Sequence, residues 1–260
     1  MSAARPTSSA LDVTLADGVA VLELRRPPAN YFDAELIGAL VEATHALDDE
    51  PACRALVLCA QGKHFCAGAD FGGSFSEDKP GTAARLYHEA ARLFESRKPI
   101  VAAVQGAAVG GGLGLACAAD FRVADPATRF VANFARLGIH QGFGLTVTLP
   151  ELIGKQAAAD LLLRGGTVRG EEAARIGLVD RLVEPGAQRA AAIALATEIA
   201  GAAPRAVASI RATLRAGLAE RVRQALEHEL AEQTKLWRTA DAAEGIAAGL
   251  ERRAPVFTGA

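Results

Sequence analysis

Apolar and polar residues follow two different patterns over the first part of the chain. Runs such as Ile100 to Val104 are apolar throughout, which is typical of a strand buried on both faces. Segments such as Ala83 to Ser96 instead repeat apolar residues at helical spacing, which predicts an amphipathic helix. The predicted strands are 11–15, 19–25, 55–59, 100–104, 121–124 and 129–132, with a hairpin turn at Asp17-Gly18, and the predicted helices are 33–48, 83–96 and 111–119. Strands and helices in this order favour an α/β fold whose strands pair in parallel through crossover helices.

The pattern becomes helical almost throughout after Leu149 and Pro150. The predicted helices there are 155–163, 170–176, 187–200, 204–216, 221–237 and 241–250, with one short strand at 178–183. The last helices have too little neighbouring sheet to bury their apolar faces alone. We therefore expect them to pack on the front part of the chain, on a neighbouring subunit, or on both. The expected organisation is a loose tail over 1–10, a core over 11–200 and a helical region over 201–260.

Composition and charge narrow the possible function. Half of the 260 residues are apolar and the formal net charge is −2, which gives no electrostatic reason to expect a nucleic acid or an anionic membrane as partner. No apolar run approaches the ~18 residues that a membrane-spanning helix needs, and Met1 to Ala10 lacks the apolar core of a signal peptide. The cysteines have no metal-type spacing and lie in apolar surroundings, so we expect no metal site and reduced thiols in a cytoplasmic protein: Cys53, Cys59, Cys66 and Cys117.

Two glycine-containing segments are candidates for binding an anion. Gly110 to Gly112 lead into a short helix, whose first N–H groups are free and carry partial positive charge. Gly68, in the long loop 61–82, allows a turn that leaves the N–H of Ala69 unpaired. Two such N–H groups form an oxyanion hole if they converge. A phosphate site would also need a basic residue and a Ser or Thr, and Leu113 to Leu115 supply neither. The alternative is two glycine turns without a ligand.

These segments also carry a resemblance to a known family. The motifs are RRPPAN at 25–30, CAGAD at 66–70, QGAAVGGGLGLACAAD at 105–120, GEEAARIGLVDRLV at 170–183 and RAPVFTG at 253–259. In this order the chain resembles the crotonase superfamily, the enoyl-CoA hydratases and isomerases. The resemblance implies a spiral of ββα units with a helical C-terminal trimerisation region, assembled as a homotrimer or homohexamer. It also implies an acyl-CoA substrate and no other cofactor, with coenzyme A present only as part of the substrate.

The resemblance assigns roles to individual residues. The oxyanion donors fall on the backbone N–H groups of Ala69 and Gly111. Phe257, near the end of the chain, is expected to reach the coenzyme A of a neighbouring subunit. Tyr87 is expected either to donate a hydrogen bond in the acyl pocket or to pack as an aromatic side chain. The residues expected to contact substrate are Cys66, Ala67, Gly68, Asp70, Tyr87, Gly110, Gly114, Phe134, Phe143 and Phe257.

The sequence departs from the hydratases at the residues that move protons. Their two glutamates fall here on Gly114 and Phe134, and an acidic position of other members falls on Gly142. Neither Gly nor Phe can transfer a proton, so we do not expect efficient hydration. The nearest titratable residue, His140, is either a replacement acid or base or a structural loop histidine.

Three alternatives therefore remain open for the function. The first is an acyl-CoA enzyme that stabilises a thioester enolate. The second is a decarboxylase, an isomerase or a C–C hydrolase on the same scaffold with His140 as acid or base. The third is an acyl-CoA-binding protein without catalysis.

Overall fold

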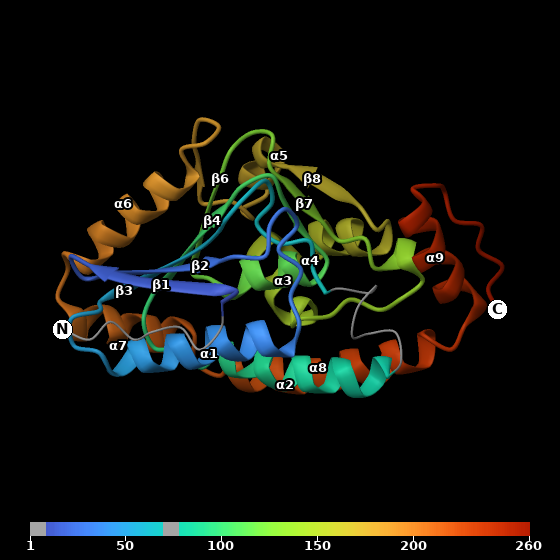
Figure 1. Ribbon diagram of the computed structural model, residues 1–260, viewed down its shortest axis with the longest axis horizontal. Coiled ribbons are helices and arrows are strands. Elements are labelled where there is room, and N and C mark those ends of the chain that lie inside the picture. The colour runs from blue at the N-terminus through green and yellow to red at the C-terminus, as the bar shows by residue number, and fades with distance from the viewer. Residues whose placement is uncertain (1–8, 70–77) are drawn as a thin grey trace.

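The computed structural model describes residues 9–69 and 78–260 (Figure 1). Its larger sheet has six strands in the order β1-β2-β3-β4-β6-β9. The hairpin β1–β2 is antiparallel and every other neighbouring pair in this sheet is parallel, as the alternation of strands and helices predicts. The strands are β1 Leu11–Ala16, β2 Val19–Leu24, β3 Ala55–Ala60, β4 Ile100–Val104, β6 Phe121–Ala124 and β9 Arg181–Leu182.

A second, smaller sheet lies beside the first and was only partly predicted. It consists of β5 Ala107–Val109, β7 Arg129–Val131 and β8 Thr167–Arg169. Strand β7 was expected, whereas β5 and β8 were missed. Each has three residues, which is too short for a periodic pattern to show. Strand β5 matters because it leads directly into the glycine helix.

Most helices agree with the predicted segments; the 3₁₀ helix η1 was not predicted, and α2, α4 and α8 begin earlier than expected. Helix α2 begins at Lys79 rather than at 83, because the Asp78 side chain accepts the Gly81 N–H and Pro80 fits the first turn. Helix α4 begins at Leu145 rather than at 155, and consists of two halves that meet at a kink at Gly154. The helices are α1 Ala34–Asp49, α2 Lys79–Leu93, α3 Gly111–Ala118, the 3₁₀ helix η1 Ala135–Leu137, α4 Leu145–Leu163, α5 Gly170–Arg175, α6 Gln188–Ala200, α7 Pro204–Leu214, α8 Leu218–Leu236 and α9 Ala240–Glu251.

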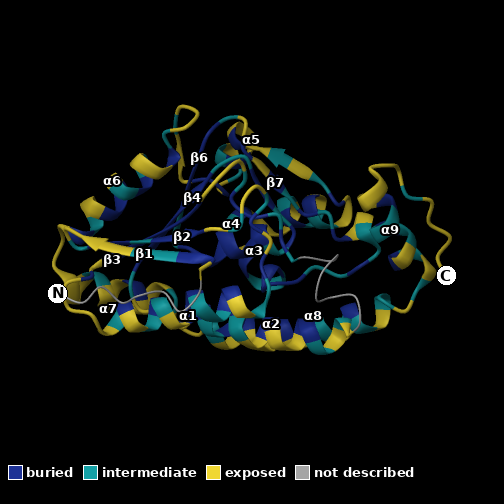
Figure 2. Ribbon diagram, viewed as in Figure 1, coloured by how far each residue is buried: buried dark blue, intermediate teal, exposed yellow. Residues whose placement is uncertain are grey.

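The inner strands β2, β3, β4 and β6 of the six-stranded sheet are buried on both faces, whereas the edge strands β1 and β9 are largely exposed. Alternate side chains of a strand point to opposite faces, so Val57 and Val101 pack with Leu195 of α6 in one apolar cluster. Leu56 and Ala102 point to the other face and belong to the main core, which includes residues of helices α1 to α4. Figure 2 shows these strands as buried and the outer surfaces of α6 and α7 as exposed.

The C-terminal helices pack on the front part of the chain. Helix α8 contacts α2 and α4, and α9 contacts the segment around η1; Figure 1 shows α1, α2, α7 and α8 as one layer along the sheet. This packing confirms the first of the two partners expected for these helices. Association with a second subunit stays a prediction.

Three further features of the described residues concern the thiols, possible metal ligands and possible membrane-spanning helices. All four cysteines are free and buried, and burial raises the pKa of each thiol. The described part of the chain contains no group of three or more His, Cys, Asp or Glu residues placed to hold a metal ion. No single described helix is long and apolar enough to cross a membrane; the bent pair α6–α7 meets that test by length and composition only.

Candidate active site

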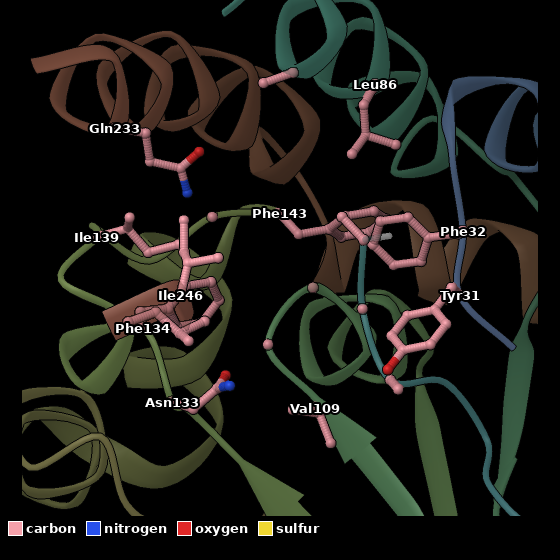
Figure 3. A pocket seen from close by; sticks show the side chains of 18 of the residues that line it. Tyr31, Phe32, Leu86, Val109, Asn133, Phe134, Ile139, Phe143, Gln233 and Ile246 are labelled. Atoms are coloured by element: carbon pink, nitrogen blue, oxygen red, sulfur yellow. The ribbon is translucent and has the colours of Figure 1, made fainter. Parts of the chain in front are cut away.

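A cavity of about 530 Å³ opens where the loop after β3, the β5–α3 junction and helices α2, α8 and α9 meet (Figure 3). Its described wall is mostly apolar, with Leu86, Ile139 and Ile246 among the side chains that face it. The walls come from segments between Tyr31 and Leu250, so the cavity depends on the packing of nearly the whole chain.

Most of the predicted site residues line this cavity: Ala67, Gly68, Ala69, Tyr87, Gly110, Gly111, Phe134 and Phe143. Cys66 and Gly114 lie behind the described wall, and Phe257 lies on the surface with 42% of its area exposed. Asp70 lies outside the described residues.

The two glycine segments converge at the cavity. The Phe32 N–H donates to the Gly68 carbonyl at 3.0 Å, which holds the loop against the segment before α1. Gly68 has a φ of +91°, and a Cβ built on it would lie 2.8 Å from the Val109 carbonyl oxygen and 3.4 Å from the Gly111 nitrogen. A side chain at position 68 would therefore separate the two segments.

Two backbone donors at this junction have no acceptor in the described part of the chain. Gly111 is the first residue of α3, so its N–H has no partner within the helix. Among residues 9–69 and 78–260, neither this N–H nor that of Ala69 donates a hydrogen bond. Both residues line the cavity. The cavity wall thus carries two backbone N–H groups, from separate segments, that have no acceptor among the described residues.

The space above Gly114 is closed. A Cβ at this position would lie 2.6 Å from the Cβ and 2.9 Å from the carbonyl oxygen of Phe143. The Phe143 side chain is 1% exposed, and its ring lies 5.2 Å from that of Phe32, measured between centroids. Phe143 therefore occupies the volume into which a side chain on Gly114 would extend.

A hydrogen-bonded pair closes the space beside Gly142 in the same way. A Cβ on Gly142 would overlap the Tyr87 hydroxyl oxygen. That hydroxyl donates to Gln233 Oε1 at 3.0 Å. Gln233 Nε2 in turn donates to the His140 carbonyl oxygen at 2.8 Å. Burial raises the pKa of Tyr87 well above its ordinary value, so the hydroxyl stays protonated.

Sequence reasoning missed Gln233 as a site residue, although a signal was present. Helix α8 has Val222, Leu226, Glu229 and Gln233 on its buried side. A glutamate and a glutamine one turn apart on an otherwise apolar face require partners inside the protein. Their partners could not be identified before the fold was known.

The structure does not bring His140 into the cavity. The described wall contains its neighbour Ile139 but not His140 itself. The His140 Nδ1 lies 2.9 Å from the Gln141 carbonyl oxygen, and its ring packs edge-on against His228 at 5.6 Å between centroids. This arrangement corresponds to the structural alternative for His140.

Glu229 is a buried carboxylate close to the same loop. Its two oxygens accept the backbone N–H groups of Gly144 at 2.9 Å and Thr146 at 3.0 Å, at the start of α4. Burial raises the pKa of Glu229 to about 7, while these hydrogen bonds oppose the rise. Glu229 does not line the cavity, so its contacts fix the loop that carries Phe143.

The described wall contains no strong proton carrier. None of the lining residues in the described ranges is Asp, Glu, His, Lys or Arg. The titratable side chains there are the phenols of Tyr31 and Tyr87. The described part of the wall has backbone donors but no carboxylate or imidazole.

Comparison with known proteins identifies the family of this chain. The family model described as enoyl-CoA hydratase/isomerase matches residues 14–260. The crotonyl-CoA hydratase of Syntrophomonas wolfei is 34% identical over 246 residues, covering 92% of this chain and 94% of that protein. The (E)-benzylidenesuccinyl-CoA hydratase of Thauera aromatica is 37% identical over 250 residues, covering 93% and 96%.

Solved structures agree in fold. The crystal structure of an enoyl-CoA hydratase/isomerase from Pseudoalteromonas atlantica superposes with a TM-score of 0.86 and 30% identity, covering 96% of this chain and all of that one. An enoyl-CoA hydratase from Mycobacterium avium subsp. paratuberculosis gives 0.84 and 25%, covering 96% and 99%. The expected crotonase-like fold with C-terminal helices is thereby confirmed.

Proposed function

Because this chain belongs to the enoyl-CoA hydratase/isomerase family, a family of lyases and isomerases, we propose that its cavity binds an acyl-CoA thioester. The N–H groups of Ala69 and Gly111 together bind the thioester carbonyl oxygen. The observation that carries this proposal is the pair of free donors from separate segments at one point of the wall. As negative charge builds up on the oxygen of an enolate, each donor contributes about 2.7–4 kcal/mol to transition-state stability.

We further propose that the reaction is not an efficient hydration. Adding water across a double bond requires one group to activate the water and one to deliver a proton, and each contributes about 10²- to 10⁴-fold to the rate. The positions of the hydratase glutamates carry Gly114 and Phe134, and Phe143 fills the space over Gly114. His140 is no substitute, because its ring packs on His228 outside the cavity wall.

The arrangement favours a reaction in which a C–C bond of the substrate supplies the enolate electrons. In a decarboxylation, the electrons of the bond to the carboxylate become the enolate, carbon dioxide leaves, and a proton from solvent completes the product. In cleavage of a β-dicarbonyl thioester, water adds to the distal carbonyl and the bond to the α carbon breaks. Both place charge on the oxygen that Ala69 and Gly111 bind. Decarboxylation needs no activated water, whereas the cleavage needs a group or solvent to accept a proton from the water that adds.

Two assays on the purified chain test this function. We expect crotonyl-CoA to bind but to be hydrated at least about 10³-fold more slowly than the ~10 s⁻¹ of a typical enzyme. A panel of malonyl-type and 3-oxoacyl thioesters should give product at a higher rate. Hydration of crotonyl-CoA near 10 s⁻¹ would contradict the proposal that the site lacks the proton carriers that hydration requires. Failure to bind any acyl-CoA would contradict the proposal as a whole.

A further inference from the structure

The hydroxyl of Tyr87 and the amide of Gln233 already form hydrogen bonds within the protein. The His140 carbonyl can only accept, so the end of the Gln233 amide that faces it is Nε2, and Gln233 Oε1 is left to accept from Tyr87. Tyr87 therefore donates to Gln233 and cannot donate to a ligand without breaking that bond. This pair positions the loop that carries Phe143, and it does not select the ligand.

Asn133 is different, because its amide has no partner among the described residues. The Asn133 side chain lines the cavity and makes no hydrogen bond in the part of the chain that the structure describes. Its wall neighbours are apolar: Figure 3 shows the amide at the wall between Phe134 and Val109. A primary amide carries two donors and an acceptor, and Asn133 is half-buried, so solvent reaches its amide in the free chain. A ligand that displaces this water has to replace its hydrogen bonds. A ligand oxygen in the cavity would satisfy a donor.

Asn133 lies close to Gly110, the residue before the Gly111 donor. A Cβ built on Gly110 would lie 3.4 Å from Asn133 Oδ1, and Gly110 is bonded to Gly111. Covalent geometry then keeps the amide oxygen within about 7 Å of the Gly111 nitrogen. A thioester oxygen bound to Gly111 would have its α and β carbons within the same distance.

We propose that Asn133 selects the acyl group by donating an amide N–H to an oxygen on its α or β carbon. The proposal rests on the proposed function, since it takes the thioester to be bound at Ala69 and Gly111. The substrate class is a 3-oxoacyl or 3-hydroxyacyl thioester whose remaining acyl chain is apolar. This class fits the cleavage of a β-dicarbonyl thioester. A carboxylate, as in the decarboxylation, would bind more weakly, because no described lining residue carries a positive charge to pair with it. Bulky apolar chains suit the walls formed by Leu86 and Ile246.

Binding measurements on matched thioesters test the selection. Trp237 lines the cavity and is the one tryptophan of the chain, so its fluorescence reports occupancy. Dissociation constants are measured for a saturated acyl-CoA, its 3-oxo and 3-hydroxy derivatives, and a malonyl-type thioester of similar size. The variants are Asn133→Leu, which removes the amide at nearly constant shape, and Asn133→Asp, which removes the donors and adds charge. Ile246→Val is the control for a change in cavity volume, and a melting curve verifies that each variant is folded.

We expect the native chain to bind the 3-oxo compound about tenfold more tightly than the saturated one. Asn133→Leu and Asn133→Asp should both lose this preference, whereas Ile246→Val should change both affinities by the same factor.

Equal affinity for the two compounds in the native chain would overturn the selection, as would a preference that survives in both Asn133 variants. Tighter binding of the malonyl-type thioester would overturn the neutral-oxygen assignment. If none of the thioesters binds, the proposed function fails as well, which distinguishes that failure from a failure of the selection alone.

Discussion

Gly114 and Gly142 are positions where a single methyl group would collide with the neighbouring chain. At Gly114 the obstacle is the backbone and Cβ of Phe143, and at Gly142 it is the hydroxyl of Tyr87. A side chain larger than hydrogen at either position would therefore require its neighbour to move. A glutamate introduced at position 114 would have no room unless Phe143 also became smaller.

This packing yields a stability prediction for Gly114→Ala. Alanine is the better helix former, but the added methyl group in α3 would overpack against Phe143. We expect a net loss of about 1–3 kcal/mol in the free energy of unfolding, measured by chemical denaturation. The matched control is Gly38→Ala in α1, where a Cβ would lie 3.6 Å from the Glu89 side chain, an ordinary contact. It should gain up to about 1 kcal/mol. Equal effects at the two sites would show that position 114 has room after all.

At the residue scale the sequence revealed what is missing but not what fills the space. That the two hydratase glutamates fall on Gly114 and Phe134 is an expectation drawn from the motifs, and it stays a prediction. The position of Phe143 over Gly114, and the bond between Tyr87 and Gln233, join segments far apart in the chain. No local pattern specifies such contacts, because they depend on how the helices pack.

At the scale of elements, helix α8 fixes the loop between η1 and α4. Gln233 binds the His140 carbonyl, and Glu229, one turn earlier, binds the N–H groups of Gly144 and Thr146. The two residues therefore hold the loop from both ends and keep Phe143 in place. A buried carboxylate in this role makes stability depend on pH.

Glu229→Gln tests that dependence. The pKa of Glu229 is raised from 4.5 to about 7 by burial, so between these values the folded chain binds more protons than the unfolded chain. Its contribution to the free energy of unfolding therefore falls as the pH rises through this range. We expect the stability of the native chain, relative to Glu229→Gln, to fall by about 3 kcal/mol from pH 4.5 to 7.

Denaturation at a series of pH values measures this difference. The control is Glu227→Gln, an exposed position on the same helix, which should keep the native pH profile. If the free energy of unfolding depends on pH in the same way for the native chain and for Glu229→Gln, then Glu229 does not titrate in this range.

Helix α7 is attached to the sheet through Asp120. Arg211 Nε and Arg215 both donate to this carboxylate at 2.9 Å, and the Ile100 N–H donates to it at 2.8 Å. Removing the charge would leave two largely buried guanidinium groups without their anion. We expect Asp120→Asn to lower the free energy of unfolding by about 3 kcal/mol.

The comparison for this variant is Asp160→Asn. Asp160 pairs with Arg164 on the surface, with 58% and 74% of their side chains exposed, so its loss should have no measurable effect. Similar denaturation midpoints for the two variants would mean that Asp120 does not anchor α7.

Most elements followed from periodicity, and the exceptions have local causes. Helix α4 was predicted only in its second half, because Pro150 reads as a break although a helix runs through it up to the kink at Gly154. Strands β5 and β8 are too short to show a pattern, and they form only because β7 lies between them. Whether such short segments form strands depends on the strand beside which the fold places them.

At the scale of the whole molecule, the cavity is lined by residues from both sides of residue 200, where the sequence predicted a division of the chain. Gln233 of α8 and Ile246 of α9 line it together with Gly68 and Gly111. The C-terminal helices are therefore part of the site's wall. The division into a core and a trimerisation region stays a prediction.

Association into a trimer or a pair of trimers also stays a prediction, and α7 offers a test. Ile210 and Leu214 lie one turn apart on this helix with 60% and 81% of their area exposed. A second copy of the chain would bury such apolar side chains. We expect light scattering to give three or six times the mass of one chain, and a lower mass for the double variant Ile210→Glu/Leu214→Glu. A native chain that is monomeric at micromolar concentration would contradict the assembly.

The most direct test of the central claim is the infrared carbonyl stretch of an isotope-labelled acyl-CoA thioester bound to the chain. Two backbone donors on one oxygen would polarise the carbonyl bond, so we expect the band at lower frequency than for the thioester in water. Gly68→Ala, whose methyl group would push the two segments apart, should return the band toward its free position. A bound thioester with an unshifted band would contradict the claim that Ala69 and Gly111 bind its oxygen.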